Sequence, residues 1–194
     1  MFVKICGVRE PEQVAAAVEA GADAVGFVLT RSKRQVTPLR ARELAESVPS
    51  HLLTVGVFSG ESPDAVRAAV LEAGLRAVQL HGRHPQSDFA ALKDLGLPLI
   101  RAVASDADLR CGAYGESMLI VDAPKPGSGQ PWDWSVIGGR ASGRWMLAGG
   151  LAPDSVARAI AEVHPWGVDV SSGVERDGVK DPGLIRRFVA AARS

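Results

Sequence analysis

Two side chains able to exchange protons stand at the ends of apolar runs. Cys6 follows "FVKI" and Asp122 follows "SMLIV". A helix is expected to begin near Pro11, and a helix N-terminus lowers the pKa of a nearby thiol, which makes a thiolate base or nucleophile available. Burial beside apolar residues raises the pKa of a carboxyl, which can then act as an acid near neutrality. The alternative is that Cys6 is a small core residue and Asp122 a turn or cap residue.

Glycine-rich turns follow the last two apolar runs. "LAGGLAPDSV" passes from a strand through Gly149 and Gly150 to a helix opened by Pro153, and "VDVSSGVE" places Ser172 and Gly173 after a strand. Backbone N–H groups at such turns bind phosphate, and glycine lets the main chain approach it closely. A phosphate site is favoured here over two ordinary turns. The run "KPGSGQ" (125–130) lacks the spacing of a Walker loop and is interpreted as a lid.

Three further features complete the candidate site. Arg34, in the basic loop "RSKR" (31–34), could hold a carboxylate through two hydrogen bonds, or that loop could simply be solvated. His81 ends the run "RAVQL" and is expected either to line the pocket or to be a satisfied hydrogen-bonding residue. Cys111 lies in a weakly structured segment and is interpreted as structural. No spacing around the cysteines suggests a metal site, so no metal is expected.

The elements that would position these residues alternate between strand and helix. β-branched runs occupy 2–5, 24–29, 52–58, 76–80, 98–103, 117–122, 144–148 and 166–171, and helix-like stretches occupy 11–21, 38–48, 62–74, 86–96, 152–163 and 181–193. Segments 104–116 and 123–143 are weaker, with one helical turn expected near Trp134–Ile137. About eight such units predict a compact α/β protein, a (β/α)8 TIM barrel, with its active site at the C-terminal ends of the strands. A doubly wound sheet would need G-x-G-x-x-G where "CGVREPE" stands.

Composition narrows the classes of partner. The 194 residues are 46% hydrophobic, and 22 Lys and Arg balance 22 Asp and Glu, so neither nucleic acid nor a membrane is an expected partner. The longest apolar runs fall short of the roughly 18 residues that a membrane span needs. Residues 1–194 are expected to form a single domain. Two cysteines without a disulfide framework, and no signal-peptide pattern, predict a cytoplasmic protein. A monomer and a homodimer both stay open.

An ordered set of motifs resembles the phosphoribosylanthranilate isomerase family from residue 3 to about 181. The motifs are "VKICGV", "GADAVGFV", "SKRQV", "VGVF", "VQLHG", "VDAPKPGSGQPWDW", "LAGGL" and "VDVSSGVE". The resemblance implies a step of tryptophan biosynthesis: a cofactor-free Amadori rearrangement of N-(5-phosphoribosyl)anthranilate, a small phosphosugar substrate, to the 1-deoxyribulose 5-phosphate ketoamine.

The resemblance also assigns roles to residues. It implies that Cys6 is the general base and Asp122 the general acid, with Arg34 at the anthranilate carboxylate and Asp169 at a ribose hydroxyl. The phosphate would lie at Gly149, Gly150, Ser172 and Gly173. The chain departs from the family pattern at Arg83 and His84, where acidic residues are common, and at Pro126, where glycine is common.

Two other functions stay in view. A related phosphosugar isomerase of the histidine pathway would call for an aspartate in place of Cys6 and a clearer half-barrel repeat. A non-catalytic phosphosugar-binding barrel could keep the glycine-rich turns, but it would not need Cys6 and Asp122 together.

Overall fold

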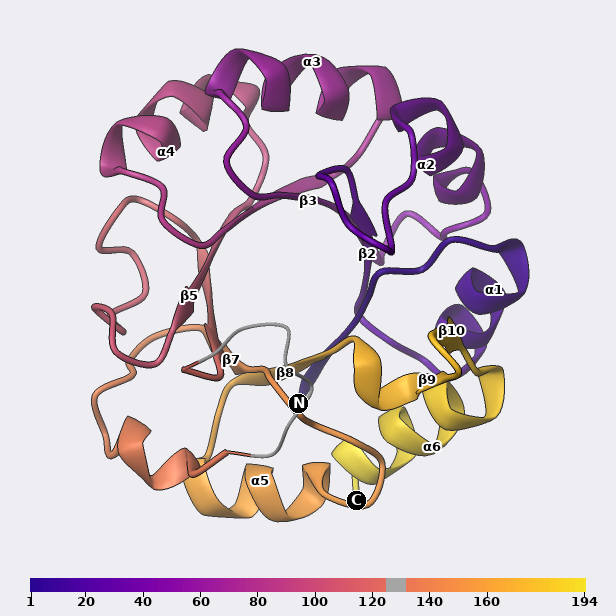
Figure 1. Cartoon of the computed structure of the whole chain (residues 1–194), viewed down its shortest axis with the longest axis vertical. Coiled ribbons are helices and arrows are strands. Elements are labelled where there is room, and N and C mark those ends of the chain that lie inside the picture. The colour runs from indigo at the N-terminus through magenta and orange to yellow at the C-terminus, as the bar shows by residue number, and fades with distance from the viewer. Residues whose placement is uncertain (125–131) are drawn as a thin grey trace.

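Eight parallel strands close into a barrel in the computed structural model, which describes residues 1–124 and 132–194. Each strand pairs with the next in the chain, and β8 returns to β1 (Figure 1). The strands are β1 (Phe2–Cys6), β2 (Ala24–Val28), β3 (Leu53–Phe58), β4 (Ala77–His81), β5 (Leu99–Ala104), β6 (Met118–Asp122), β7 (Trp145–Leu147) and β8 (Gly167–Val170). The predicted TIM-barrel class is confirmed. The extent of the domain, residues 1–194, stays a prediction.

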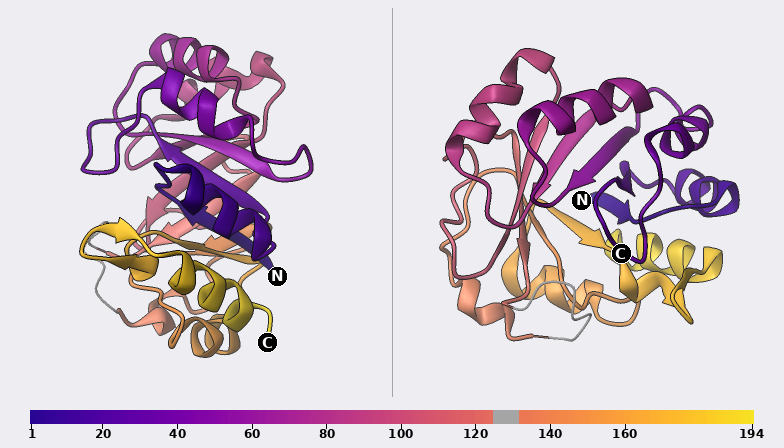
Figure 2. Two further views of the ribbon diagram at one scale, coloured as in Figure 1. Left: turned by 90° about the vertical axis from the view of Figure 1, so that its right-hand side faces the viewer. Right: turned by 45° about the horizontal axis from the view of Figure 1, so that its top comes forward.

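Helices form an outer ring around the strands (Figures 1 and 2). They are α1 (Pro11–Glu19), α2 (Pro38–Ala45), α3 (Pro63–Ala73), α4 (Gln86–Leu92), α5 (Val156–Val163) and α6 (Pro182–Ala192). Proline opens four of them, at a position where the absent N–H would have had no partner in the helix. Thr37, Ser62 and Asp181 cap three of these, each accepting a backbone N–H with its side chain. These prolines and capping side chains therefore determine where the helices begin.

The ring of helices is incomplete beside β5 and β6. Among the described residues no α-helix follows either strand, and only a short 3-10 turn, η2 (Trp134–Ile137), packs beside α5 on that side. Trp134 and Ile137 are buried there, so a single turn supplies the apolar cover. Both weak units were predicted. The start of α5 differs from the prediction, because a turn at 153–155 precedes the helix.

Two apolar clusters stabilise the barrel. The larger lies between strands and helices, and the smaller fills the barrel interior with mostly small or branched side chains such as Ala24, Val55, Ala77 and Ile120. Because these interior side chains are small, there is room for polar side chains at the C-terminal ends of the strands. None of the helices in the described parts of the chain is long and apolar enough to cross a membrane.

Two additions follow β8 before α6. The turn η3 (Ser172–Val174) leads directly into a two-stranded hairpin, β9 (Glu175–Arg176) and β10 (Val179–Lys180). Asp177 and Gly178 make its turn with positive φ, a geometry that Asp-Gly favours. The hairpin places charged side chains beside the mouth of the barrel.

Candidate active site

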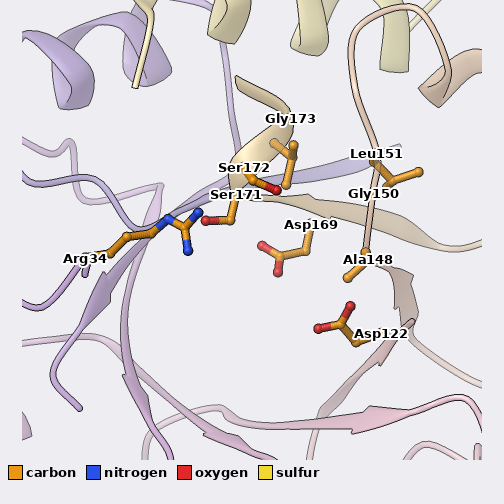
Figure 3. A pocket seen from close by; sticks show the side chains of 11 residues that line it. Arg34, Asp122, Ala148, Gly150, Leu151, Asp169, Ser171, Ser172 and Gly173 are labelled. Atoms are coloured by element: carbon orange, nitrogen blue, oxygen red, sulfur yellow. The ribbon is translucent and has the colours of Figure 1, made fainter. Parts of the chain in front are cut away.

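The C-terminal mouth of the barrel contains two adjoining hollows. One, of about 240 Å³, is lined by Cys6, Gln79 and His81 among others, and a recess of about 80 Å³ is lined by the loops after β7 and β8. Asp122 and Asp169 border both hollows, as do Arg34 and Ser171, so the two form one continuous site. Figure 3 shows the two carboxylates and the Arg34 guanidinium pointing into this mouth. The described residues include no cluster of three or more His, Cys, Asp or Glu able to hold a metal ion.

Asp122 ends β6 with its carboxyl group largely buried in this mouth, at 8% exposure. Burial raises the pKa of Asp122 above its usual value, as predicted. The backbone N–H of Ala123, which donates to Oδ1 at 2.7 Å, and the nearby His81 oppose that rise only in part. The residue therefore holds a proton to a higher pH than an exposed aspartate does.

Cys6 ends β1 and lines the same cavity, with 7% exposure. The expectation that a helix N-terminus lowers the pKa of this thiol is wrong: burial raises the pKa, and Asp169 raises it further. α1 begins only at Pro11 and contributes none of the main influences on Cys6. The groups that favour the thiolate are Lys4 and Lys180.

The two glycine-rich turns face each other across the recess, where Gly149, Gly150, Ser172 and Gly173 come together. A Cβ atom at Gly149 would lie 2.6 Å from Asp122 Oδ1, and one at Gly173 would lie 1.7 Å from the carbonyl oxygen of Leu151. Glycine is therefore required at both positions for packing alone, independently of any ligand. Residues of both turns line this recess.

Arg34 is held by the hairpin after β8. Its Nε donates to Glu175 Oε1 at 2.6 Å and its Nη2 to Oε2 at 2.8 Å, while Lys180 also donates to Oε1. Burial would raise the pKa of Glu175, but these two cations lower it to about 2. Within the described residues Nη1 of Arg34 has no hydrogen-bond partner, so this edge of the guanidinium is free for an anion.

Four residues of the site escaped the sequence reasoning: Lys4, Gln79, Glu175 and Lys180. Lys4 is completely buried and donates to Asp169 Oδ1 at 2.8 Å. Gln79 is 2% exposed, and its Oε1 is buried without a partner among the described residues. Strand alternation could have found both, because they stand two residues before Cys6 and His81, on the same face.

The loop after β4 has a structural role in this chain. His84 Nε2 accepts the backbone N–H of Gly60, so its ring proton lies on Nδ1, which donates to Asp88 at 2.9 Å. His84 thus ties this loop to the loop after β3. The other departure, Pro126, and the expected lid 125–130 lie outside the described residues.

Comparisons with known proteins identify relatives over the whole barrel. The model of the family "N-(5'phosphoribosyl)anthranilate (PRA) isomerase" matches residues 3–191. The N-(5'-phosphoribosyl)anthranilate isomerase of Symbiobacterium thermophilum is 42% identical, over 100% of this chain and 98% of the relative.

Solved structures agree with this result. The structure of TrpF from Jonesia denitrificans is 42% identical, with a TM-score of 0.91 over 100% of this chain and 97% of that one. A phosphoribosyl anthranilate isomerase in complex with reduced 1-(o-carboxyphenylamino)-1-deoxyribulose 5-phosphate is 36% identical, with a TM-score of 0.86 over 100% of this chain and 98% of that one.

The fold and the site together define a TIM-barrel enzyme with an acid and a thiol at the mouth of its barrel. The chain belongs to the phosphoribosylanthranilate isomerase family. It is an aldose–ketose isomerase of tryptophan biosynthesis, as the resemblance of its motifs implied.

Proposed function

We propose that Cys6 is the general base and Asp122 the general acid of this isomerisation. The observation that supports this assignment is their arrangement: the two side chains stand at the ends of β1 and β6 and border one cavity. Both are mostly buried, so that each can hold or release a proton at a defined position.

Asp122 acts first, on the ring oxygen of the sugar. The protonated carboxyl donates to the furanose oxygen as the C1′–O bond breaks, and the amine nitrogen forms an iminium with C1′. The raised pKa of Asp122, which burial causes, keeps this proton available near neutrality.

Cys6 then removes a proton from C2′. The electron pair of the C2′–H bond forms the C1′–C2′ double bond, and the iminium becomes a neutral amine, which gives an enolamine. This enol tautomerises: C1′ gains a proton and the C2′ hydroxyl loses one, which leaves the ketone. One proton passing through water from Cys6 to Asp122 restores both groups.

Remote anchors hold the substrate between these groups. We assign the phosphate to the recess formed by Gly149, Gly150, Ser172 and Gly173, and the anthranilate carboxylate to the free edge of Arg34. Asp169 keeps Oδ2 for a ribose hydroxyl, since Oδ1 accepts from Lys4. His81, at the end of β4, lines the cavity wall. The two unpaired cysteines suit the cytoplasm, which we propose as the location.

The test compares three single variants by the loss of fluorescence of N-(5-phosphoribosyl)anthranilate, with no added metal. Cys6→Ser and Asp122→Asn should each lower kcat by several orders of magnitude and still bind reduced 1-(o-carboxyphenylamino)-1-deoxyribulose 5-phosphate. Cys111→Ser, which changes the thiol outside the cavity, should keep wild-type activity. Near-normal kcat in either active-site variant would refute the role of that residue.

A further inference from the structure

Lys4 is a buried cation that the proposed acid–base steps leave unused. It stands two residues before Cys6 on β1, so both side chains point into the barrel, with Lys4 one layer deeper. None of its surface is exposed. A lysine in such a place keeps its charge only if a partner of opposite charge compensates for the lost water.

Asp169 supplies that partner because of the strand register. Lys4 and Asp169 are paired directly across β1 and β8, and Nζ donates to Oδ1 at 2.8 Å. Burial by itself would lower the pKa of Lys4, but Asp169 and Cys6 outweigh it, so that the pKa is raised. The ammonium therefore stays charged throughout the neutral range.

Lys4 and Cys6 also share the space beside one glycine. Gly26 on β2 is the register partner of Cys6, and a Cβ atom there would lie 3.0 Å from Cys6 Sγ and 3.4 Å from Lys4 Cε. The lysine stem and the thiol thus pack against the same bare stretch of backbone. The ammonium that Asp169 holds therefore lies one layer below the sulfur on the same face of β1.

We propose that Lys4 is a positioning residue for Cys6: its buried ammonium, held by Asp169, is the countercharge that lets a thiolate form at the top of the barrel. This inference rests on the proposed role of Cys6 as the base. The thiolate needs such a charge, because burial disfavours the ionised sulfur and the helix α1 does not compensate.

Other ionisable groups facing Cys6 do not replace Lys4 as its countercharge. They are Arg34 after β2, His81 on β4, Asp122 on β6, Asp169 on β8 and Lys180 on β10. Asp169 disfavours a thiolate, and neither Asp122 nor His81 is among the main influences on Cys6. Arg34 and Lys180 both donate to Glu175, whose carboxylate compensates much of their positive charge. Loss of Lys4 would also leave Asp169 without its cation, so the thiolate would be disfavoured twice.

The test measures Cys6 itself, by the pH dependence of its alkylation with the neutral reagent iodoacetamide. All variants carry Cys111→Ser, so that only one thiol reacts. In Lys4→Met we expect the alkylation midpoint to rise by about one pH unit or more, and the rate at neutral pH to fall about tenfold. The rising limb of kcat/KM should move by the same amount. Lys93→Met, at an exposed lysine of η1 (Lys93–Leu95), is the control and should change neither.

A second variant keeps the proposal testable if Lys4→Met fails to fold. Lys4→Met combined with Asp169→Asn removes both charges of the pair, and its midpoint should still lie above that of the parent, because the influence of Lys4 on Cys6 exceeds the opposing influence of Asp169. A folded variant with lower activity but an unchanged alkylation midpoint would overturn the proposal, since a purely structural lysine predicts that result. If Cys6→Ser keeps its activity while the midpoint still moves, the role of Cys6 as base fails and the charge relationship stands.

Discussion

Arg34 and Glu175 form a two-pronged ion pair that ties the loop after β2 to the hairpin after β8. The N–O distances are 2.6 and 2.8 Å, and the partners are 141 residues apart in the chain. The aliphatic part of Arg34 crosses Gly7, where a Cβ atom would come within 2.7 Å of Arg34 Cδ. The orientation of the guanidinium is thus fixed by protein contacts before any anion arrives.

Glu175→Gln should weaken substrate binding more than turnover. The neutral amide cannot hold the guanidinium through two charge-assisted hydrogen bonds, each of which contributes about 1.5 kcal/mol or more. We expect KM to rise about tenfold or more with a much smaller change in kcat, measured by steady-state kinetics. Glu72→Gln, at an exposed position of α3, serves as the control. A fall in kcat at constant KM would contradict this role.

The lowered pKa of Glu175 predicts how the stability of the fold changes in acid. Its pKa is lowered from 4.5 to about 2, so its contribution to the free energy of unfolding is complete above pH 4.5 and is lost as the pH falls toward 2. Urea unfolding across this interval should show a steeper loss of stability in the wild type than in Glu175→Gln. Parallel curves for the two proteins would show that the carboxylate is not linked to folding.

Asp122→Asn should gain stability as it loses activity. The pKa of Asp122 is raised by burial, so its favourable contribution is complete below its usual value of 3.8 and declines as the pH rises through the raised pKa. Asparagine cannot ionise and keeps an oxygen for the Ala123 N–H. The variant should therefore have the higher melting temperature at neutral pH, with the difference closing in acid. A lower melting temperature of Asp122→Asn than of the wild type at neutral pH would contradict the inference that burial of the Asp122 carboxyl group costs the fold stability.

Gln79→Leu should raise the stability of the fold and lower the catalytic activity. The substitution removes a buried carbonyl that has no partner in the described residues, which should add about 1 kcal/mol to the free energy of unfolding. Gln79 also lines the cavity, where its amide group can hydrogen-bond to a substrate hydroxyl or amine, so kcat/KM should fall about tenfold. Gln86→Leu at the exposed start of α4 is the comparison. Loss of stability in Gln79→Leu would mean that the amide is satisfied in solution.

Gly173→Ala should be far more damaging than Gly74→Ala. At Gly173 an added Cβ would meet the Leu151 carbonyl at 1.7 Å, whereas at Gly74 it would meet nothing within 4 Å. The cost at Gly74 comes only from its left-handed φ of 61° and should be about 1 kcal/mol. At Gly173 we expect a loss of about 3 kcal/mol or more in urea unfolding. Similar losses in the two variants would contradict the packing found here.

The sequence was sufficient to predict the barrel fold and the places of Cys6 and Asp122 at the ends of two strands. Eight apolar runs, each followed by a helix or a loop, predict parallel strands, and the rule that sites lie at their C-terminal ends selects Cys6 and Asp122. The start of α5 was misplaced, because Pro153 opens a turn at 153–155 before the helical hydrogen bonding begins. Proline suits both geometries, so its presence alone could not distinguish them.

What the sequence could not supply were relationships that exist only after the barrel closes. The Lys4–Asp169 pair joins the first strand to the last, and no local pattern measures that register. The strands of the β9–β10 hairpin have two residues each, too few for a periodic signal, although Asp177-Gly178 is a recognisable turn. The raised pKa of the thiol depends on burial and on these distant charges, and for that reason its predicted direction was wrong.

The tight fit at Gly149 and Gly173 bears on how such chains can diverge. A descendant that had abandoned turnover would still have to keep both glycines, because an Asp122 oxygen at one position and the Leu151 carbonyl at the other already fill the place of a methyl group. Conserved glycines at these two positions would therefore indicate only a shared ancestor. Whether Cys6 is kept would be the better indicator that a descendant is still catalytically active.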